Sequence, residues 1–580
     1  MIVELVGLPG SGKSTFARTL EKEGKWVRAR PGGRLELIWL SSLFCLRHPV
    51  STLHQLSWLI RYRGHRALWY TKFVNLFLVH NAKYMKASRM PYALIDQGHL
   101  QNTMSLFDAT CSSEEIARYV RILPPPDAAL FFDISNVERT RRLGVRGYGV
   151  REGGPTDLRR DWQEASEKHF AQLLANRREL PCTTLVLTEG GEEKLMTQLS
   201  DFRLWRFVMH LRMPTEKAHG LQIAKTLEAM TLRGEMVELW VPARKNIITE
   251  DIFTYYSLTA HFPVRAITSF AALRFVRVLG SIAYWLDALA FLVALAMERI
   301  ETESVYYTRS APVAWLLAQK GAHVYFEAHL WPNTKEKVFR ALLRGVSLVV
   351  ANSDGTREMF RKNGFVNTVV IRNGADLEKF ALSISHHDAR KKLNLNLGEN
   401  IIMYVGSFAR WKGVATLYAA WVKIQKQFPD TRLVFVGGEK NTLAQFDACG
   451  DIDQNDRVTV LPHQQAALVP TYLRAANVLV LPNEAISEES IRYTSPIKLF
   501  EYMASGRPII VSDLPAMHEV LDDTTSTFFE AGNSDDLAIK LSYALTHGEE
   551  GESRAKMASV NAEEFSWQKR AQRLSAMVQN

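Results

Sequence analysis

The first residues of the chain have the types and spacing needed to bind a polyphosphate. Residues 7–14 read GLPGSGKS and follow the apolar residues 2–6, so the motif lies where a predicted strand turns into a predicted helix. In such a loop the backbone N–H groups surround a phosphate, Lys13 reaches the terminal phosphates and the Ser14 hydroxyl can hold Mg²⁺. The motif therefore predicts that ATP and Mg²⁺ are bound by Gly7, Gly10, Gly12, Lys13, Ser14 and Thr15.

A carboxylate follows a second predicted strand of the same region. Residues 92–96 read YALID, an apolar strand that ends in Asp96. An acid at this position can hold the Mg²⁺ shell together with Ser14, or orient a nucleophile opposite Lys13, as phosphoryl transfer requires. Asp96 is therefore predicted to be a metal ligand and a catalytic residue, although many strands end in an aspartate without such a role.

Arginines gather beside glycines in residues 138–151, after a further predicted strand at residues 128–133. Residues 1–195 thus resemble a small P-loop kinase of the nucleoside or adenylyl-sulfate kinase type, in which an arginine-bearing lid closes over the phosphates. The resemblance makes Arg142, Arg146 and Arg151 candidate lid residues, which would stabilise charge on the transferred group. The alternative interpretation is a solvated basic helix. The sequence does not identify a phosphate acceptor.

A second group of residues suited to phosphate chemistry lies near the other end of the chain. Residues 410–413 read RWKG and residues 495–501 read SPIKLFE. A nucleotide sugar presents a diphosphate and a ribose, so its site needs cations and an acceptor for the ribose hydroxyls. Lys412 and Lys498 can be the cations, Glu501 the acceptor, and Gly406 lets the phosphates approach the backbone. The alternative is that both lysines are ordinary surface residues.

Several motifs in this half of the chain agree in order and spacing with one family. Residues 205 to 575 resemble the GT-B glycosyltransferases, specifically the retaining glycosyltransferase family 4, in segments 401–413, 433–438 and 494–512. The resemblance assigns the ribose to Glu501, places His329 beside the transferred sugar, and places Gly220 in a loop against donor and acceptor. The departing diphosphate is then stabilised by fixed charges, so no metal is expected there. The helix near residues 565–571 resembles the tail that crosses back between GT-B domains.

Two positions depart from the common pattern of family 4. The first of its two glutamates, eight residues before Glu501, is replaced by Tyr493, and the arginine of the diphosphate loop is replaced by Ser407. Lys498 matches a variant of the family and can replace the lost contact. The departures also permit an alternative in which both halves of the chain sense nucleotides without catalysis.

The elements that must position these residues follow an α/β pattern. A chain of 580 residues with 47% hydrophobic and 23% charged residues is typical of a soluble protein of three or four domains. Apolar strands alternate with helical segments. We expect a P-loop NTPase-type parallel-sheet domain at residues 1–195, a linker near residues 189–204, and two Rossmann-like domains in a GT-B arrangement. Their expected bounds are 205–385 for the acceptor side and 386–580 for the nucleotide-sugar side, which ends in the crossover helix.

Positive charge is concentrated in one block. Twelve Lys and Arg lie between residues 25 and 95, against a single acid, Glu36. Many aromatic and aliphatic residues at helical spacing accompany them, which suits a phosphorylated substrate or an anionic membrane surface. No nucleic-acid-binding motif is present, so we expect no nucleic-acid partner. The alternative is a helical insertion with solvated basic groups.

Residues 282–297 are apolar but short and contain Asp287, which predicts a buried helix or a face that touches a membrane.

Together the motifs predict a bifunctional enzyme. One half would transfer a sugar from a nucleotide sugar to a saccharide or lipid-linked acceptor of surface-polysaccharide or glycolipid synthesis, and the other would be an ATP-dependent phosphotransferase. The first residues lack the pattern of a signal peptide, so we expect a cytoplasmic protein held peripherally at the inner membrane leaflet. Two alternatives remain: a P-loop domain that acts only as a regulatory switch, and a non-catalytic nucleotide-sensing scaffold.

Overall fold

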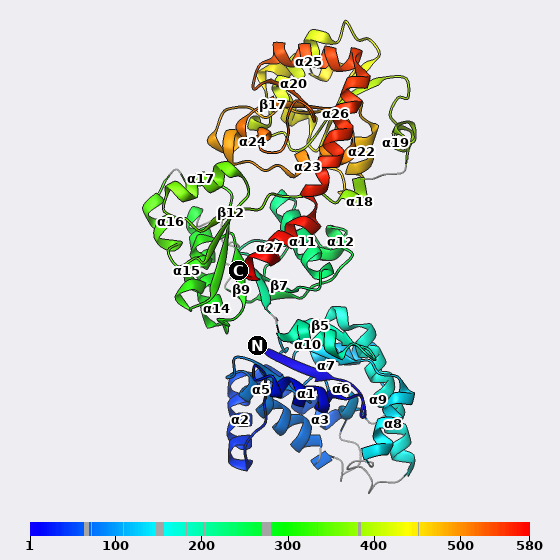
Figure 1. Cartoon of the computed structure of the whole chain (residues 1–580), viewed down its shortest axis with the longest axis vertical. Helices are drawn as coiled ribbons and strands as arrows, with labels where there is room; N and C mark the ends of the chain where they lie inside the picture. Colours follow the sequence, from blue (N-terminus) through cyan, green and yellow to red (C-terminus); the bar gives the residue numbers. More distant parts are fainter. Residues whose placement is uncertain are drawn as a thin grey trace.

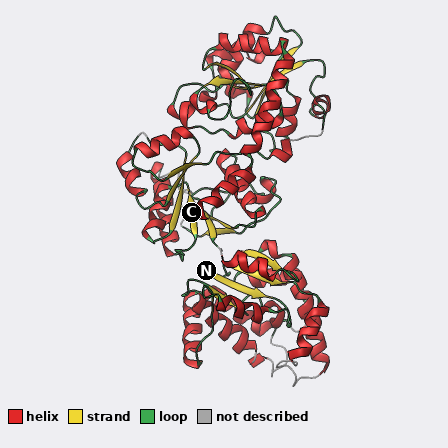
Figure 2. Cartoon of the chain, viewed as in Figure 1, coloured by secondary structure: helices red, strands yellow, loops and turns green. Residues whose placement is uncertain are grey.

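The chain folds into three α/β units that follow one another along the long axis of the molecule (Figure 1). The computed structural model describes residues 1–580 except 63–68, 71, 108–109, 147–155, 181, 201–202, 270–279, 333, 381–383, 451 and 580. Within the described residues each unit contains one parallel sheet, and helices connect its strands (Figure 2). The expected α/β class is confirmed.

The first unit is built on a sheet of order β2-β3-β1-β4-β5. The central strand β1 pairs with β3 and β4 and is buried along its whole length. The strands are β1 Ile2–Val6, β2 Val27–Arg28, β3 Ala93–Ile95, β4 Ala128–Phe132 and β5 Thr183–Leu187. The helices are α1 Lys13–Lys22, α2 Arg34–Arg47, α3 Pro49–Arg61, the π-helical η1 Phe73–Val79, α5 His80–Ala87, α6 Thr103–Leu106, α7 Ser113–Arg121, α8 Asn136–Arg146, α9 Thr156–Ala175, η2 Arg177–Glu179 and α10 Glu192–Ser200.

Helix α10 occupies most of the segment that the sequence analysis expects to be a linker. Its Leu195 and Leu199 are four residues apart, so they lie on one face of the helix and are buried in the core beneath β1. The Trp26 indole nitrogen also donates a hydrogen bond to the Leu199 carbonyl at 3.3 Å. The first unit therefore continues to the end of α10, beyond residue 195.

The middle unit has a sheet of order β12-β11-β10-β9-β6-β7-β8, so the strand order reverses between β6 and β9. Its strands are β6 Leu204–Val208, β7 Met236–Pro242, β8 Val264–Ile267, β9 Val305–Thr308, β10 His323–Ala328, β11 Leu348–Ala351 and β12 Thr368–Val370. Its helices are α11 Ala218–Leu232, α12 Ile252–Tyr255, α14 Ser281–Met297, α15 Ala311–Gln319, α16 Glu336–Leu342 and α17 Asp354–Lys362. Ligands of such sheets bind where the order reverses, beyond the carboxyl ends of the strands.

The third unit has a sheet of order β15-β14-β13-β16-β17-β18, which reverses between β13 and β16. Its strands are β13 Asn400–Val405, β14 Thr431–Val436, β15 Val458–Leu461, β16 Val478–Leu481, β17 Ile509–Asp513 and β18 Thr527–Glu530. Its helices are α18 Leu377–Phe380, α19 His386–Lys392, η4 Arg410–Lys412, α20 Val414–Ile424, α21 Lys440–Leu443, η5 Asp447–Cys449, η6 Ile452–Gln454, α22 Val469–Ala475, the π-helical η7 Glu489–Tyr493, α23 Ile497–Ser505, α24 Pro515–His518, α25 Ser534–Thr546, α26 Gly548–Asn561, η8 Ala562–Phe565 and α27 Trp567–Gln579.

The middle and third units exchange segments of chain. Helix α27 leaves the third unit and lies along α11 of the middle unit (Figure 1), where Trp567 and Leu574 are buried in the middle core. In the other direction, Ala375 and Phe380 are buried in the core of the third unit. The third unit therefore begins before residue 386, because the apolar side chains that precede this position pack against its sheet.

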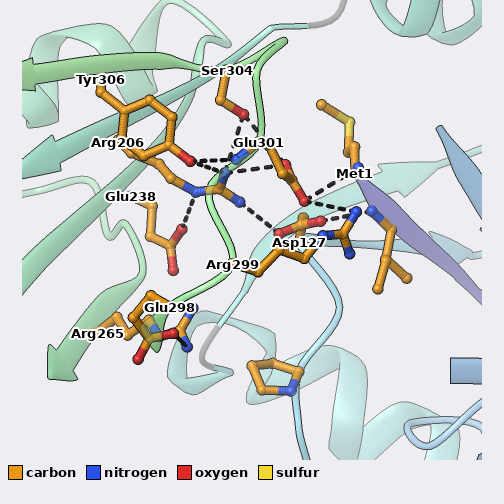
Figure 3. Close-up of polar contacts among 12 residues, drawn as sticks. Met1, Asp127, Arg206, Glu238, Arg265, Glu298, Arg299, Glu301, Ser304 and Tyr306 are labelled. Carbon is orange, nitrogen blue, oxygen red and sulfur yellow. Dashed lines mark hydrogen bonds and ion pairs between the residues drawn. The ribbon is translucent and has the colours of Figure 1, made fainter. Parts of the chain in front are cut away.

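Buried ion pairs join the first and middle units (Figure 3). The guanidinium of Arg206, on β6, lies 2.7 Å from Asp127 Oδ1 of the first unit and 3.1 Å from Glu301 Oε2 of its own unit. Asp127 directly precedes β4 and also accepts the Ile2 N–H at 2.6 Å. The amino ends of β1 and β4 thus face the middle unit. The carboxyl ends of these strands, where the predicted phosphate loop lies, face away from this joint.

Candidate functional site

The third unit brings Lys412, Lys498 and Glu501 together at the point where its strand order reverses. Lys412 ends the short helix η4, which follows the strand β13. Lys498 and Glu501 are three residues apart on α23, and Lys498 Nζ lies 3.4 Å from Glu501 Oε2. The charge of Lys498 also lowers the pKa of Lys412, which requires the two ammonium groups to be near each other. Lys412, Lys498 and Glu501 therefore share this edge of the sheet, and the charge of Glu489 also acts on Lys412.

The electrostatics of this edge favour an anionic ligand. Burial, and then the neighbouring charge of Lys498, lower the pKa of Lys412 to about 8. The Lys412 ammonium also lies 3.6 Å from the centroid of the Trp411 ring. A negatively charged group between the two lysines would relieve their repulsion.

Glu501 has unused hydrogen-bonding capacity. Its Oε2 is buried and makes no hydrogen bond among the described residues, although it lies within ion-pair distance of Lys498. A buried carboxylate oxygen is normally hydrogen-bonded, so this atom can accept from a ligand hydroxyl. Such an arrangement suits recognition of a ribose.

The backbone around these residues leaves no room for side chains at two glycines. A Cβ on Gly413, which has φ +67°, would lie 1.6 Å from the Pro482 carbonyl oxygen. A Cβ on Gly406 would lie 2.6 Å from the Tyr404 hydroxyl. The loops after β13 and β16 are therefore in direct backbone contact. The Val405 N–H donates to the Tyr502 hydroxyl at 2.8 Å, which ties the end of β13 to the helix that carries Glu501.

The two residues that depart from the family pattern have structural partners. Tyr493 is 7% exposed, and its carbonyl oxygen accepts a hydrogen bond from Asn352 Nδ2 of the middle unit at 2.9 Å. Ser407 is exposed, and its carbonyl oxygen accepts from the Tyr404 hydroxyl at 2.8 Å. Position 493 thus contributes to the contact between the two units and offers no carboxylate to a ligand.

His329 follows β10 directly and lies in a cluster of charged groups of the middle unit. Arg309, which follows the neighbouring strand β9, donates to His329 Nε2, and Asn352 Nδ2 lies 3.3 Å from His329 Nδ1. Burial, and then the charge of Arg309, lower the pKa of His329. His329 is therefore neutral near pH 7 and suited to hydrogen bonding with a sugar.

A buried glutamate organises this cluster from the carboxyl end of β10. Glu327 accepts hydrogen bonds from Gln222 and, at 2.7 Å, from Arg570 Nη2, and its Oε1 lies 3.6 Å from His329 Nε2. Burial alone would raise the pKa of Glu327, but the charges of Arg570 and Arg309 hold it well below its usual range. The carboxylate therefore stays ionised and balances the two guanidinium groups.

Arg570 reaches this cluster from the C-terminal helix α27. It is 2% exposed, and its guanidinium also donates to the Ile371 carbonyl at 2.7 Å and to the Tyr307 hydroxyl at 3.2 Å. Arg309, Glu327, Asn352 and Arg570 were not predicted from the sequence as site residues. Arg309 and Glu327 could have been found from their positions at strand ends, as His329 was, whereas nothing local in the sequence marks Arg570.

Gly220 lies in the first turn of α11, near the same cluster. A Cβ at this position would lie 2.2 Å from the Tyr256 hydroxyl, which accepts the Thr215 N–H at 2.8 Å. The neighbouring His219 has its pKa lowered to about 4 by burial and then by the charge of Arg309. The start of α11 therefore lies close to the His329 cluster and is closely packed by Tyr256.

Comparison with known proteins assigns part of this structure to a family. Residues 385–564 match the Glycosyl transferases group 1 family. These residues form a glycosyl transferases group 1 domain. The domain contains the sheet and the edge on which Lys412, Lys498 and Glu501 meet.

Several curated relatives share sequence with the chain. It is 30% identical over 150 residues to the Escherichia coli UDP-Gal:alpha-D-GlcNAc-diphosphoundecaprenol alpha-1,3-galactosyltransferase. The aligned region covers 25% of this chain and 36% of that protein. It is 27% identical over 326 residues to the phosphatidyl-myo-inositol mannosyltransferase of Mycobacterium tuberculosis, covering 53% of this chain and 76% of that protein. In most of the curated matches, the chain spans about half of the relative's length or less.

Solved structures share the fold of the middle and third units. The Anabaena HepE structure in complex with UDP and glucose aligns with a TM-score of 0.51 at 17% identity, over 65% of this chain and 99% of that one. Sucrose-phosphate synthase from Thermosynechococcus elongatus aligns with a TM-score of 0.51 at 18% identity, over 65% of this chain and 98% of that one. The group 1 domain and the unit before it thus have the GT-B arrangement of these glycosyltransferase structures.

The predicted phosphate loop of the first unit lies between β1 and α1. Gly10 and Gly12 have φ of +82° and +93°, a left-handed backbone that favours glycine. Lys13 is 8% exposed, and its ammonium donates to the carbonyls of Gly7 and Leu8 within the loop. Burial, and then the charge of Arg139, lower the pKa of Lys13 to about 7.

The other residues predicted for this loop lie around it. The Gly7 N–H donates to Gln101 Oε1 at 3.1 Å, and Ser14 and Thr15 lie on the exposed side of α1. Asp96 directly follows β3, the neighbour of β1, and therefore lies at the same sheet edge as the loop.

Asp96 already has cationic partners. Lys83 Nζ lies 2.8 Å from its Oδ1, and Arg30 Nη2 lies 3.5 Å from its Oδ2. Burial acts to raise the pKa of Asp96, but Lys83 and the arginines lower it overall, so the carboxylate is ionised. Among the described residues, no group of three or more His, Cys, Asp and Glu could hold a metal ion.

One of the candidate lid arginines contacts the loop. Arg142 Nη1 donates to the Ser11 carbonyl at 3.4 Å, and a Cβ on Gly12 would lie 2.8 Å from the same nitrogen. Arg142 is held by Glu138, whose Oε1 accepts from its Nε at 2.6 Å. Arg146 belongs to α8, but its side chain lies outside the described structure, as does the whole of Arg151.

Proposed function

We propose that the chain transfers a sugar from a nucleotide sugar, with retention of configuration, to a saccharide or lipid-linked acceptor. The observation that carries this proposal is the meeting of Lys412, Lys498 and Glu501 at the reversal point of a glycosyl transferases group 1 domain. The names of two relatives supply the acceptor class, since they contain diphosphoundecaprenol and phosphatidyl-myo-inositol. Surface polysaccharides and glycolipids are the products of such acceptors.

The proposed mechanism relies on fixed charges. Lys412 and Lys498 bind the diphosphate and stabilise the negative charge that grows on it as the glycosidic bond breaks. Glu501 accepts hydrogen bonds from the ribose hydroxyls, and Gly406 lets the phosphates approach the backbone. Neutral His329 orients the sugar from the opposite unit, and Gly220 lets Tyr256 pack against the start of α11 beside the His329 cluster. No metal takes part in this scheme.

The test combines binding and turnover. A thermal-shift screen against UDP-, GDP- and ADP-sugars should identify one donor that raises the melting temperature, because a ligand of the native state stabilises it. Hydrolysis of that nucleotide sugar should be lost in Glu501→Ala. Full turnover in this variant would remove Glu501 from the site.

A second activity is favoured by the arrangement of the first unit. We infer an ATP-dependent phosphotransferase, because the phosphate loop follows the central strand β1, Asp96 follows the neighbouring strand and Arg142 contacts the loop. The loop glycines fit a polyphosphate, since a Cβ on Gly12 would fill the space beside Arg142. Ser14 and Asp96 would hold Mg²⁺, which would neutralise charge on the phosphates.

The variant Lys13→Ala distinguishes a phosphotransferase from a domain that only binds ATP as a regulatory switch. Transfer of phosphate from ATP to a sugar, lipid or nucleotide that disappears in the variant would support the phosphotransferase. If the wild type binds ATP without turning it over, and Lys13→Ala no longer binds ATP, the first unit is a regulatory switch instead.

A further inference from the structure

Helix α14 of the middle unit turns a wholly apolar face to solvent. Residues Ala283, Asp287, Phe291 and Leu295 recur every four positions and are buried. The exposed side chains of this 17-residue helix are Ile282, Tyr284, Trp285, Leu286, Leu289, Val293 and Met297. Trp285 is 67% exposed and Met297 is 85% exposed. Soluble domains rarely leave such a continuous apolar stripe uncovered, so this face is adapted to a partner.

The charged residue of α14 is excluded from this face. Asp287 is the one Asp, Glu, Lys or Arg between residues 281 and 297, and it points inward. It forms an ion pair with Arg244 and lies 3.3 Å from His210 Nε2. The inward face therefore holds the polar contacts, and the outward face of the helix carries no charge.

Basic side chains border the apolar face of α14. The Lys335 ammonium lies 5.2 Å from the centroid of the Trp285 ring. Lys335 immediately precedes α16, where Lys337 and Arg340 are also exposed. Exposed aromatic rings can enter an apolar layer, and lysine and arginine beside them can bind negative charge at its surface. This combination suits a partner with an apolar interior and an anionic surface.

A second apolar patch lies on α2 of the first unit, close to the end of α14. Leu35, Ile38, Trp39 and Leu46 are exposed on α2. The guanidinium of Arg89 lies 4.4 Å from the Trp39 ring centroid. The next residue, Met90, accepts a hydrogen bond at 3.2 Å from Arg299, two residues beyond the end of α14. Both helices lie toward the left of the view in Figure 1.

We propose that α14 and α2 form one docking surface for an anionic lipid bilayer. None of the described helices is long and apolar enough to cross a membrane, so α14 would lie in the plane of the headgroups. At a rise of about 1.5 Å per residue its apolar stripe is roughly 25 Å long. Arg34 and Arg47, both exposed on α2, supply attraction to anionic headgroups. This inference does not depend on either proposed activity.

Vesicle flotation tests the surface directly. The full chain should float with vesicles of phosphatidylglycerol and phosphatidylcholine in equal amounts, but not with phosphatidylcholine alone, and added salt should weaken the binding. The double variant Trp285→Ser, Leu289→Ser should bind the anionic vesicles about tenfold or more weakly. It lacks the two apolar side chains that would enter the lipid layer. Lys335→Glu with Lys337→Glu should weaken binding by about tenfold at low salt.

The matched control changes exposed apolar residues elsewhere. Val366→Ser with Ile539→Ser alters two exposed side chains away from α14 and α2 and should bind the vesicles as the wild type does. The proposal is overturned if the wild type ignores anionic vesicles, or if Trp285→Ser, Leu289→Ser binds them unchanged while its melting temperature is that of the wild type. A concentration-dependent dimer that this double variant abolishes would show that a second copy of the chain covers the face instead. Glycosyl transfer to a soluble acceptor should persist in the variant.

Discussion

The charge of Lys498 lowers the pKa of Lys412, which makes donor binding sensitive to pH. The pKa of Lys412 is about 8 in the free protein because of its partial burial and the charge of Lys498. A bound diphosphate favours the protonated form. We therefore expect donor affinity, measured by titration calorimetry, to fall as the pH rises through 8, by up to about tenfold per pH unit. An affinity that stays constant from pH 7 to pH 9 would contradict this role of Lys412.

The variant Lys498→Met provides the matched comparison. It removes the like charge, so the pKa of Lys412 should rise and the pH at which affinity begins to fall should move upward. Affinity near neutral pH should decrease at the same time, because one of the two cations is gone. A pH profile identical to that of the wild type would show that the two lysines do not interact.

Lys13 leads to a related expectation in the first unit. Its pKa of about 7 means that the side chain is largely neutral at pH 8, whereas phosphate binding favours its charged form. ATP binding at pH 8 should therefore take up close to one proton. Calorimetry in buffers of different ionisation enthalpy measures this uptake. A binding event without proton uptake would place the ammonium away from the phosphates.

At the scale of elements, α27 supplies a charge to the site of another unit. Arg570→Met should leave Glu327 buried without its 2.7 Å partner, and the stability of the fold should fall by about 3–5 kcal/mol in urea unfolding. Because Glu327 also lies beside His329, we expect kcat to fall more than KM rises. Lys569→Met is the control: its partner Glu564 is exposed, so stability should change by less than about 1 kcal/mol.

Gly413 brings the loop between β13 and α20 into contact with the Pro482 carbonyl. In Gly413→Ala the new Cβ would clash with the Pro482 carbonyl, and the residue would keep a left-handed backbone that costs alanine about 1–2 kcal/mol. We expect the loop to move and donor binding to be lost, as measured by thermal shift. The neighbouring Trp411→Phe should retain binding. Unchanged donor affinity in Gly413→Ala would show that the contact between the two loops is not needed.

At the scale of the whole molecule, the joint between the first and middle units is built from ionised groups. Asp127→Asn weakens the bond to Arg206 while keeping the shape of the side chain (Figure 3). We expect faster hydrogen exchange in β1 and β6, because the two units separate more often. Asp447→Asn, an exposed acid of the third unit, should leave the exchange unchanged. Identical protection in Asp127→Asn would mean that the bond between Asp127 and Arg206 is not needed to hold the units together.

The orientation of this joint keeps the two proposed sites apart. The amino ends of β1 and β4 face the middle unit, so the phosphate loop lies at the far edge of the first sheet. The cluster of Lys412, Lys498 and Glu501 lies in the third unit, beyond the middle one. Any influence of ATP on sugar transfer would therefore have to pass through the middle unit.

Much of the architecture was predictable because its signals are local in the chain. Apolar strands followed by glycine and lysine, as at residues 2–14 and 401–413, predict loops at strand ends, and the structure has both. A loop at a strand end is specified by a short segment; phosphate binding at residues 7–14 stays a prediction. The match of residues 385–564 to a glycosyl transferases group 1 family likewise agrees with motifs visible in the sequence. The bounds of the units were less exact, because Leu199 and Phe380 pack across them.

The tertiary structure alone decided which distant charges meet. Arg570 and Glu327 are 243 residues apart, and Arg206 and Asp127 are 79 apart, so no local pattern links them. A buried charge is stable only beside a partner, and that partner is found by packing of whole units. The same holds for α14: the sequence by itself established that it is apolar, but the inward ion pair of Asp287 with Arg244 decided which face remains exposed.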